Sequence, residues 1–222
     1  MSPSADEVGS GPQEVELKLT VLDPGAIREL VLDPAAGLPG VIPLGPARSV
    51  ETRDRYVDTA SGTLRATGLA ARIRTSPDGR RLTVKSLARR GAGAVHRRLE
   101  LEGDAGDGDD PRGWPPSDAR DRLLVVIGAD ALATVATLRQ RRFQRDVAIG
   151  SSVVELSLDE VEVAAPDGRT DRWTEFECEL RSGDEADLTA LGAVLGSRSD
   201  LEPATTSKLD RALAAEDSFT ER

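Results

Sequence analysis

The chain has 222 residues and a mass of 23.6 kDa, and with 38% hydrophobic residues it can form one hydrophobic core, so we expect one domain rather than two. No apolar run approaches the roughly 20 residues of a membrane span, and the N-terminal residues are polar and acidic, so we expect a cytoplasmic protein without a signal peptide. A single histidine, His96, and a single cysteine, Cys178, exclude a disulfide framework and Cys-rich zinc sites. The net charge of −10 argues against a nucleic-acid-binding protein.

The basic residues are unevenly distributed along this acidic chain. Residues 48–100 contain 13 Lys or Arg and 5 Asp or Glu, which gives this segment a local charge of +8. Only three of the 29 basic residues are lysines, namely Lys18, Lys85 and Lys208. In a chain that otherwise uses arginine, these three positions are candidates for a specific role.

The first predicted elements are an unstructured lead-in, a strand and a short helix. Residues 1–12 are rich in Ser, Gly, Pro and acids and are predicted to be disordered, followed by a folded domain over residues 13–215 and a tail over 216–222. From Glu14 the sequence EVELKLTV alternates charged and apolar residues, which is the period of a strand. Asp23 and Pro24 then predict the start of a short helix that ends at Leu32.

The rest of the chain repeats this alternation, with helices between some of the strands. Strands are predicted at 72–74, 82–85, 98–102, 153–161 and 173–180, with turns at 76–79 and 166–168. Residues 103–116 are predicted to form an acidic loop, and helices are expected at about Ser117–Leu138, Asp184–Leu195 and Thr206–Ala215. This order favours an antiparallel α+β domain.

The charged faces of these strands favour a particular chemistry. One such face alone is typical of a sheet exposed to water on one side, but here Glu-x-Glu or Arg-x-Arg pairs recur with few neutral polar residues. If the sheet closes on itself, the charged faces line a lumen, where the charges need partners or a charged ligand. Arginine rows suit phosphate oxygens, and carboxylate clusters suit Mg²⁺. We therefore hypothesise a site for a metal-bound polyphosphate.

The ordered motifs resemble the CYTH domain, also called the triphosphate tunnel metalloenzyme family. Glu14-Val15-Glu16-Leu17-Lys18 matches the Glu-x-Glu-x-Lys signature that opens this domain. The resemblance covers roughly residues 14–213, and all three lysines fall where the family has a lysine. The later matching motifs, in chain order, are Tyr56-Val57-Asp58-Thr59, Leu64, Arg72-Ile73-Arg74, Leu82-Thr83-Val84-Lys85, Arg98-Leu99-Glu100-Leu101-Glu102, the arginines of 139–145, Leu158-Asp159, Glu175-Phe176-Glu177 and Ser207-Lys208-Leu209.

The resemblance implies an eight-stranded antiparallel β-barrel with surrounding helices, whose tunnel holds a triphosphate and Mg²⁺ or Mn²⁺. The residues implied to bind phosphate are Lys18, Arg72, Arg74, Lys85, Lys208 and one or two of Arg139, Arg141 and Arg142. The implied metal ligands are Glu14, Glu16, Glu100, Glu102, Asp159, Glu175, Glu177 and Glu179; for Glu100 and Glu102, pairing with arginines is the alternative role. Lys18, Lys85 and Glu16 are the implied catalytic residues, and phosphoryl transfer by such groups requires no nucleophilic Cys or His.

Three functions remain open at this point. The first is metal-dependent hydrolysis of inorganic triphosphate or a related compound, which the 3% aromatic content favours because a base or thiazole would need a ring to stack on. The second is cyclisation of ATP by a class IV-type adenylate cyclase, and the third is binding of polyphosphate without turnover. The expected partner is a small-molecule triphosphate or polyphosphate, with no nucleic acid and no membrane. Cys178 shares an apolar face with Phe176 and is expected in the core.

Overall fold

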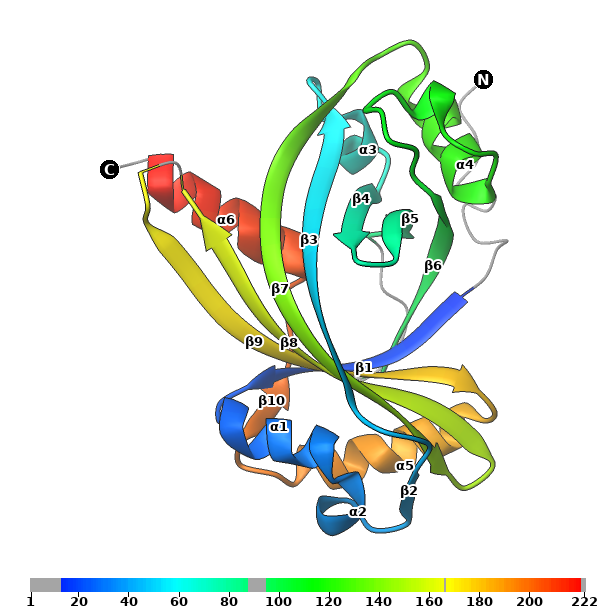
Figure 1. Cartoon of the computed structure of the whole chain (residues 1–222), viewed down its shortest axis with the longest axis vertical. Helices are drawn as coiled ribbons and strands as arrows, with labels where there is room; N and C mark the ends of the chain where they lie inside the picture. The colour runs from blue at the N-terminus through cyan, green and yellow to red at the C-terminus, as the bar shows by residue number, and fades with distance from the viewer. Residues whose placement is uncertain (1–12, 88–94, 166, 221–222) are drawn as a thin grey trace. The chain divides into compact units, whose positions relative to one another are not determined.

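The computed structural model describes residues 13–87, 95–165 and 167–220, so the predicted lead-in over 1–12 lies outside it. The helices are α1 (Pro24–Leu32), α2 (Pro34–Gly37), α3 (Thr63–Ala66), α4 (Asp118–Ile127), α5 (Glu185–Gly196) and α6 (Lys208–Thr220), with a 3₁₀ turn at Pro111–Gly113 (Figure 1). The strands are β1 (Gln13–Val21), β2 (Val41–Pro43), β3 (Arg48–Thr59), β4 (Leu69–Ser76), β5 (Gly79–Ser86), β6 (Val95–Asp104), β7 (Leu132–Ile149), β8 (Ser152–Ala164), β9 (Thr170–Ser182) and β10 (Leu201–Pro203).

The strands have the connectivity of a closed antiparallel barrel. Their hydrogen-bonding order is β1-β6-β5-β4-β3-β7-β8-β9, and β9 pairs again with β1. Two short strands are added to this ring of eight: β10 pairs with β1, and β2 pairs with β7. The predicted α+β fold with an eight-stranded antiparallel β-barrel is therefore confirmed.

The chain divides into two compact units, and several strands contribute residues to both of them. The first unit contains the described residues 13–14, 53–87 and 97–137, and the second contains 15–52, 95–96, 138–165 and 167–220. Each unit has its own hydrophobic cluster of buried side chains.

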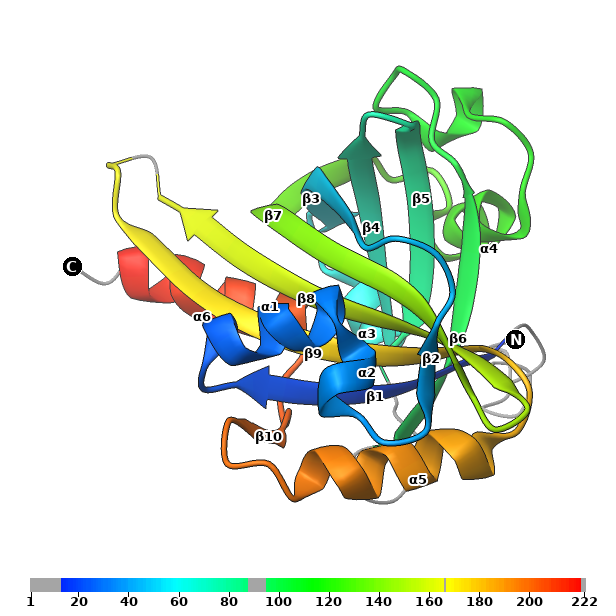
Figure 2. The same ribbon diagram turned by 60° about the horizontal axis from the view of Figure 1, so that its bottom comes forward.

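In the second unit, helices α1 and α5 cover the apolar face of the sheet (blue and orange in Figure 2). Leu17, Leu156 and Phe176 lie on this face and are at most 1% exposed. Cys178 belongs to the same cluster and is 0% exposed, so its predicted place in the core is confirmed. Burial, as the largest effect, raises the pKa of the Cys178 thiol well above its ordinary value.

In the first unit, α4 and the segment after β6 cover the apolar face of the β4–β5 hairpin. Ile73 and Leu82 face each other across the hairpin, are at most 2% exposed, and cluster with Leu123 of α4 and with Trp114. The predicted turn at 76–79 is confirmed, because Ser76 and Gly79 pair directly at the end of this hairpin. These apolar contacts leave the polar side chains of β4 and β5 on the opposite face of the sheet.

Two predicted boundaries were wrong. The helix predicted over Ser117–Leu138 ends at Ile127, because Gly128 follows with a φ of +57° that continues neither a helix nor a strand. From Leu132 the chain enters β7, a strand of 18 residues in which Thr and Val favour extended backbone. The last helix, expected to end at about Ala215, extends to Thr220 as α6.

Candidate functional site

The charged residues of β1, β7, β8 and β9 gather on one face of the sheet in the second unit. Residues directly opposite each other on paired strands point to the same face, and the register pairs Lys18 with Glu177. The alternation predicted for these strands is confirmed, but the polar face is buried rather than solvated. Glu16 and Lys18 are each 3% exposed and Asp159 is 0% exposed.

Three cations and three carboxylates form a buried ionic cluster on this face. Lys18 Nζ lies 2.6 Å from Glu175 Oε2 and 3.2 Å from Glu177 Oε1. Arg142 donates from Nε and Nη2 to the two carboxylate oxygens of Asp159, at 2.7 and 2.6 Å. We call this group the lysine cluster; its members are Lys18, Arg142, Asp159, Glu175, Glu177 and Lys208.

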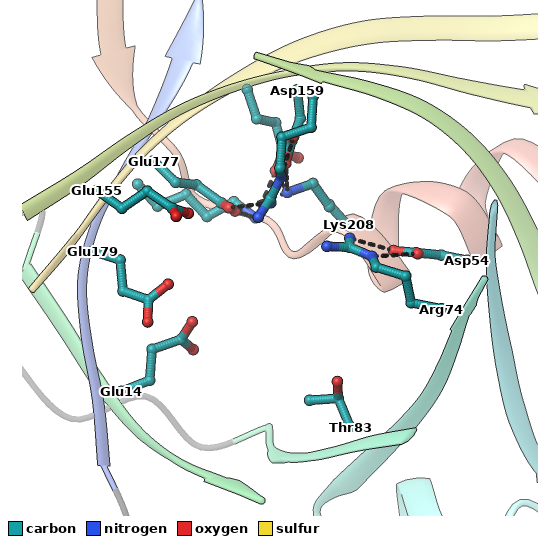
Figure 3. Close-up of polar contacts among 12 residues, drawn as sticks. Glu14, Asp54, Arg74, Thr83, Glu155, Asp159, Glu177, Glu179 and Lys208 are labelled. Carbon is teal, nitrogen blue, oxygen red and sulfur yellow. Dashed lines mark hydrogen bonds and ion pairs between the residues drawn. The ribbon is translucent and has the colours of Figure 1, made fainter. Parts of the chain in front are cut away.

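Lys208, the first residue of α6, attaches this helix to the lysine cluster (Figure 3). Its Nζ lies 2.7 Å from Asp159 Oδ2, 2.9 Å from Glu177 Oε1 and 3.3 Å from Glu175 Oε2. Burial alone would lower the pKa of Lys208, but Asp159 and Glu177 outweigh it and raise this pKa above its ordinary value. Burial alone would likewise raise the pKa of Asp159, but Arg142 and Lys208 hold it low. Lys208 and Asp159 are therefore both charged at neutral pH.

Next to the lysine cluster, three carboxylates stand in one row across neighbouring strands. Glu179 is directly opposite Glu16 of β1 on one side and Glu155 of β8 on the other, and paired strands lie about 5 Å apart. Arg181 contacts two members of this acidic row, with its Nη2 3.0 Å from Glu155 Oε1 and its Nη1 beside Glu179 Oε1. Oxygen donors of this kind fit Mg²⁺ or Mn²⁺.

In the first unit, two arginines share one aspartate. Arg72 and Arg74 stand on the polar face of β4, and Asp54 of β3 lies directly opposite Arg74. Arg74 donates from Nε and Nη2 to the two oxygens of Asp54, both at 2.7 Å (Figure 3). Arg72 donates to Asp54 Oδ2 at 3.3 Å and to Thr83 Oγ1 at 3.2 Å. We call Arg72 and Arg74 the arginine pair.

A second group in the first unit contains two carboxyl groups and two cations. Lys85 Nζ lies 2.7 Å from Glu100 Oε2 and 3.2 Å from Glu14 Oε2, and Arg98 Nε donates to Glu14 Oε2 at 2.7 Å. Burial, supported by a hydrogen bond to Glu14, raises the pKa of Glu100 to about 8 against the opposing effect of Lys85. Burial also disfavours charge on Glu14, but Lys85 and Arg98 outweigh it and keep its pKa low. Glu14 and Glu100 thus hold a proton between them at neutral pH, and we call them the carboxyl pair.

Both acidic groups supply the oxygen ligands that a hard divalent cation prefers. In the described ranges, no set of three or more His, Cys, Asp or Glu side chains is gathered closely enough to hold a metal ion by itself. Mg²⁺ is usually bound by one or two carboxylates together with substrate phosphates, rather than by a cage of protein ligands alone. The carboxyl pair and the acidic row fit that mode of binding.

The structure does not bring all the predicted site residues together. Arg139 and Arg141 lie on the opposite face of β7 from Arg142, and Arg141 packs instead against the ring of Phe143, with 4.8 Å to its centroid. The strand period of two makes this separation unavoidable once Arg142 faces Asp159. Glu102 shares the face of Glu100, but its half-exposed side chain contacts Thr83 and Arg81 rather than the carboxyl pair.

Three residues of these groups are absent from the set predicted from the sequence: Asp54, Arg98 and Glu155. Glu155 could have been found, because it stands in the same alternating run as Asp159 and shares its face. Asp54 precedes the matched Tyr56 motif by two residues and shares its strand parity, which is a weaker signal. Arg98 opens the matched motif of β6, but its partner Glu14 is 84 residues away in the chain.

Comparison with known proteins defines the family of this chain. The family model of the CYTH domain matches residues 12–213, and the chain therefore belongs to the CYTH domain family. No curated protein matches the sequence. In the described ranges, none of the helices has both the length and the apolar composition that crossing a membrane takes.

Solved structures support the same fold. The candidate adenylyl cyclase HpAC1 from Hippeastrum is 21% identical, with a TM-score of 0.67, and the match covers 91% of this chain and 96% of that one. A candidate adenylate cyclase from Bacillus halodurans is 18% identical, with a TM-score of 0.54, over 90% of this chain and 97% of that one. At these identities the likeness concerns the fold alone.

Proposed function

We propose that this CYTH protein is a divalent-metal-dependent hydrolase of inorganic triphosphate or a closely related triphosphate. The observation that carries the proposal is the burial of basic side chains at the polar face of the sheet, where Lys18 of β1 and Lys208 of α6 lie. Lys18 and Lys208 are 3% and 6% exposed, although an isolated buried ammonium group is strongly disfavoured. Such cations are costly to keep out of water, and binding a polyanion is a function that accounts for that cost.

The residue roles follow from the contacts described above. The groups proposed to bind phosphate oxygens are Lys18, Arg72, Arg74, Lys85, Arg142 and Lys208. The proposed metal ligands are Glu14, Glu16, Glu100, Glu155 and Glu179, with Glu175 and Glu177 beside the cations. Asp159 has both oxygens occupied by Arg142 and Lys208, so we assign it to holding these two cations in place.

In the proposed reaction the protein positions the substrate and stabilises charge, and no side chain has to form a covalent bond to the substrate. Lysine and arginine side chains neutralise charge on the phosphate oxygens as it develops, and their fixed positions align the triphosphate for in-line attack by water. A bound divalent cation would add Lewis-acid polarisation of a phosphoryl oxygen and activation of the attacking water. In the second unit, Glu16 with Glu155 and Glu179 of the acidic row would hold such a cation.

Two observations favour an inorganic triphosphate over a nucleotide. Trp114 and Trp173 are 3% and 6% exposed, and Arg211 covers the ring of Trp173 at 4.6 Å from its centroid, so neither ring offers an open face for stacking. The structural neighbour from Hippeastrum is a candidate adenylyl cyclase for which a dominant triphosphatase activity is described. The description of the Bacillus halodurans neighbour keeps ATP cyclisation as the alternative reaction.

Product analysis tests these functions directly. The purified chain is incubated with tripolyphosphate, thiamine triphosphate or ATP, with Mg²⁺, Mn²⁺ or EDTA, and orthophosphate, pyrophosphate and cyclic AMP are measured. Metal-dependent release of phosphate is the expected result. Cyclic AMP with pyrophosphate would favour the cyclase. Tight calorimetric binding of polyphosphate without any turnover would favour a binding module.

A further inference from the structure

We propose that Asp54 is a positioning residue, which holds the arginine pair in the orientation that binds phosphate oxygens. This inference rests on the proposed function and adds to it a residue that does not contact the substrate itself. Asp54 lies on β3, directly opposite Arg74 of β4, and it is 0% exposed.

The geometry of the Asp54–Arg74 contact fixes how Arg74 presents its donors. Asp54 occupies the edge of the guanidinium group that contains Nε and Nη2, with both distances at 2.7 Å. A guanidinium group has five N–H donors in one plane, so the three that remain point away from Asp54. A bidentate contact of this kind removes the rotation that a long, flexible side chain would otherwise keep. Arg74 is therefore preorganised for a second anion.

The same carboxylate also relieves repulsion within the arginine pair. Arg72 and Arg74 are two residues apart on one strand face, so their Cα atoms are about 7 Å apart and their positive charges repel each other. Asp54 contacts both guanidinium groups, and Thr83 gives Arg72 a second fixed partner. Asp54 thus offsets one of the two positive charges of the arginine pair.

The lysine cluster repeats this arrangement with unrelated residues. Asp159 is also 0% exposed, lies directly opposite Arg142, and accepts from its Nε and Nη2 at 2.7 and 2.6 Å. Asp159 also contacts a second cation, Lys208, as Asp54 contacts Arg72. In each unit, one fully buried aspartate thus orients an arginine on the neighbouring strand and a second basic residue.

The effect of removing the charge of Asp54 on phosphate binding distinguishes a purely electrostatic role from a positioning role. A carboxylate next to phosphate-binding arginines repels a polyanion, so replacing it with a neutral amide should strengthen binding if neutralisation were its only role. A positioning role predicts weaker binding, although the site becomes more positive by one charge. The sign of the change in affinity therefore separates the two roles.

The test is calorimetric binding of tripolyphosphate to the full chain in EDTA, which excludes any effect through metal ions. We expect D54N to bind about tenfold more weakly than the wild type, since misplacing binding groups by a small distance has large effects. D78N is the matched control: Asp78 lies exposed in the turn of the β4–β5 hairpin, and its replacement removes the same charge. We expect D78N to bind like the wild type. Binding by D54N that equals or exceeds the wild type would overturn the proposal.

Two further variants cover the case in which D54N folds poorly. D54E keeps the charge and the ion pair but moves the carboxylate by one methylene group, so it should fold, as checked by circular dichroism, and still bind more weakly. In an R72Q/R74Q background, which lacks both members of the arginine pair, D54N should change the affinity by no more than about twofold, because Asp54 acts through these two residues. If the wild-type chain binds no tripolyphosphate, the proposed function fails; if the wild type, D54N and D54E bind alike, only the role of Asp54 fails.

Discussion

At the residue scale, the contacts of Lys208 explain why this position is a lysine in a chain that mostly uses arginine. A lysine ammonium group carries three N–H donors on one nitrogen, and the Nζ of Lys208 lies within 3.3 Å of three carboxylates. The planar guanidinium group of arginine spreads its donors over three nitrogens and could not converge on these oxygens from one point.

Replacing Lys208 should therefore lower stability strongly. K208M keeps most of the side-chain volume but leaves three buried carboxylates short of one cation, and we expect a loss of about 3–5 kcal/mol in the free energy of unfolding. The measurement is urea unfolding followed by circular dichroism. R211Q on the same helix is the control. Arg211 is partly exposed, lies 4.0 Å from its partner Asp171 and covers the ring of Trp173, and its replacement should cost about 1 kcal/mol. Equal losses in K208M and R211Q would contradict the assigned role.

Glu16 and Lys18 are adjacent on the same face of β1, and their replacement should have different effects. We expect E16Q to lose turnover by about 100-fold or more because a metal ligand is removed, while it still binds tripolyphosphate in EDTA. We expect K18M to weaken that binding. Steady-state kinetics over a range of Mg²⁺ concentrations, combined with calorimetry, separates the two effects. E51Q on the exposed part of β3 is the control, and wild-type turnover in E16Q would remove Glu16 from the site.

At the element scale, the alternating strands could be predicted from the sequence because side-chain parity is a local property. Leu17 faces the core and Lys18 the polar side, as their spacing indicated. The partner of each charge could not be predicted, because it depends on the register between strands that are far apart in the chain. Three arginines at 139, 141 and 142 occupy both parities, so only the register with Asp159 shows that Arg142 belongs to the site.

The boundary between α4 and β7 shows a second limit of sequence patterns. Residues 117–138 contain enough apolar residues at helical spacing to suggest one long helix, and a single backbone conformation at Gly128 interrupts it. Gly128 has φ +57° and ψ −119°, donates its N–H to the carbonyl oxygen of Leu124, and has no atom near the position of an added Cβ. Its importance is therefore conformational rather than steric.

We expect G128A to lower the free energy of unfolding by about 1–3 kcal/mol, because alanine is strained in this conformation. Gly196, the last residue of α5, provides a control of opposite sign. An added Cβ there also meets no atom, and its backbone is not left-handed, so G196A should stabilise the protein by about 0.4–1 kcal/mol. Urea unfolding of both variants is the measurement. A G128A variant at least as stable as G196A would show that this turn tolerates a side chain.

At the scale of the whole molecule, the net charge of −10 conceals how the charges are arranged. In the lysine cluster, three cations are matched by three carboxylates, so this cluster is neutral while the chain is acidic. The carboxyl pair departs from this pattern because it retains a proton at neutral pH. A proton held by the folded state makes the stability of the molecule depend on pH.

The sign of that dependence follows from the raised pKa of Glu100. The folded protein keeps this proton up to about pH 8, whereas an unfolded glutamate loses it near pH 4.3. The folded state therefore binds more protons between these values, and this group makes stability fall as the pH rises from about 4.5 to 8. Urea unfolding from pH 5 to 9 should show a steeper decline for the wild type than for E100Q, which cannot titrate. Parallel curves would exclude a protonated Glu100.

The buried Cys178 gives the molecule a built-in reporter of its own opening. Because it is the sole cysteine, lies in the core against Phe176 and has a raised pKa, its thiol can react with a thiol reagent only when this core is exposed. The rate of labelling under native conditions thus measures how often the second unit opens. Native-state labelling of K208M and R211Q would then show whether the attachment of α6 by Lys208 protects the core between unfolding events.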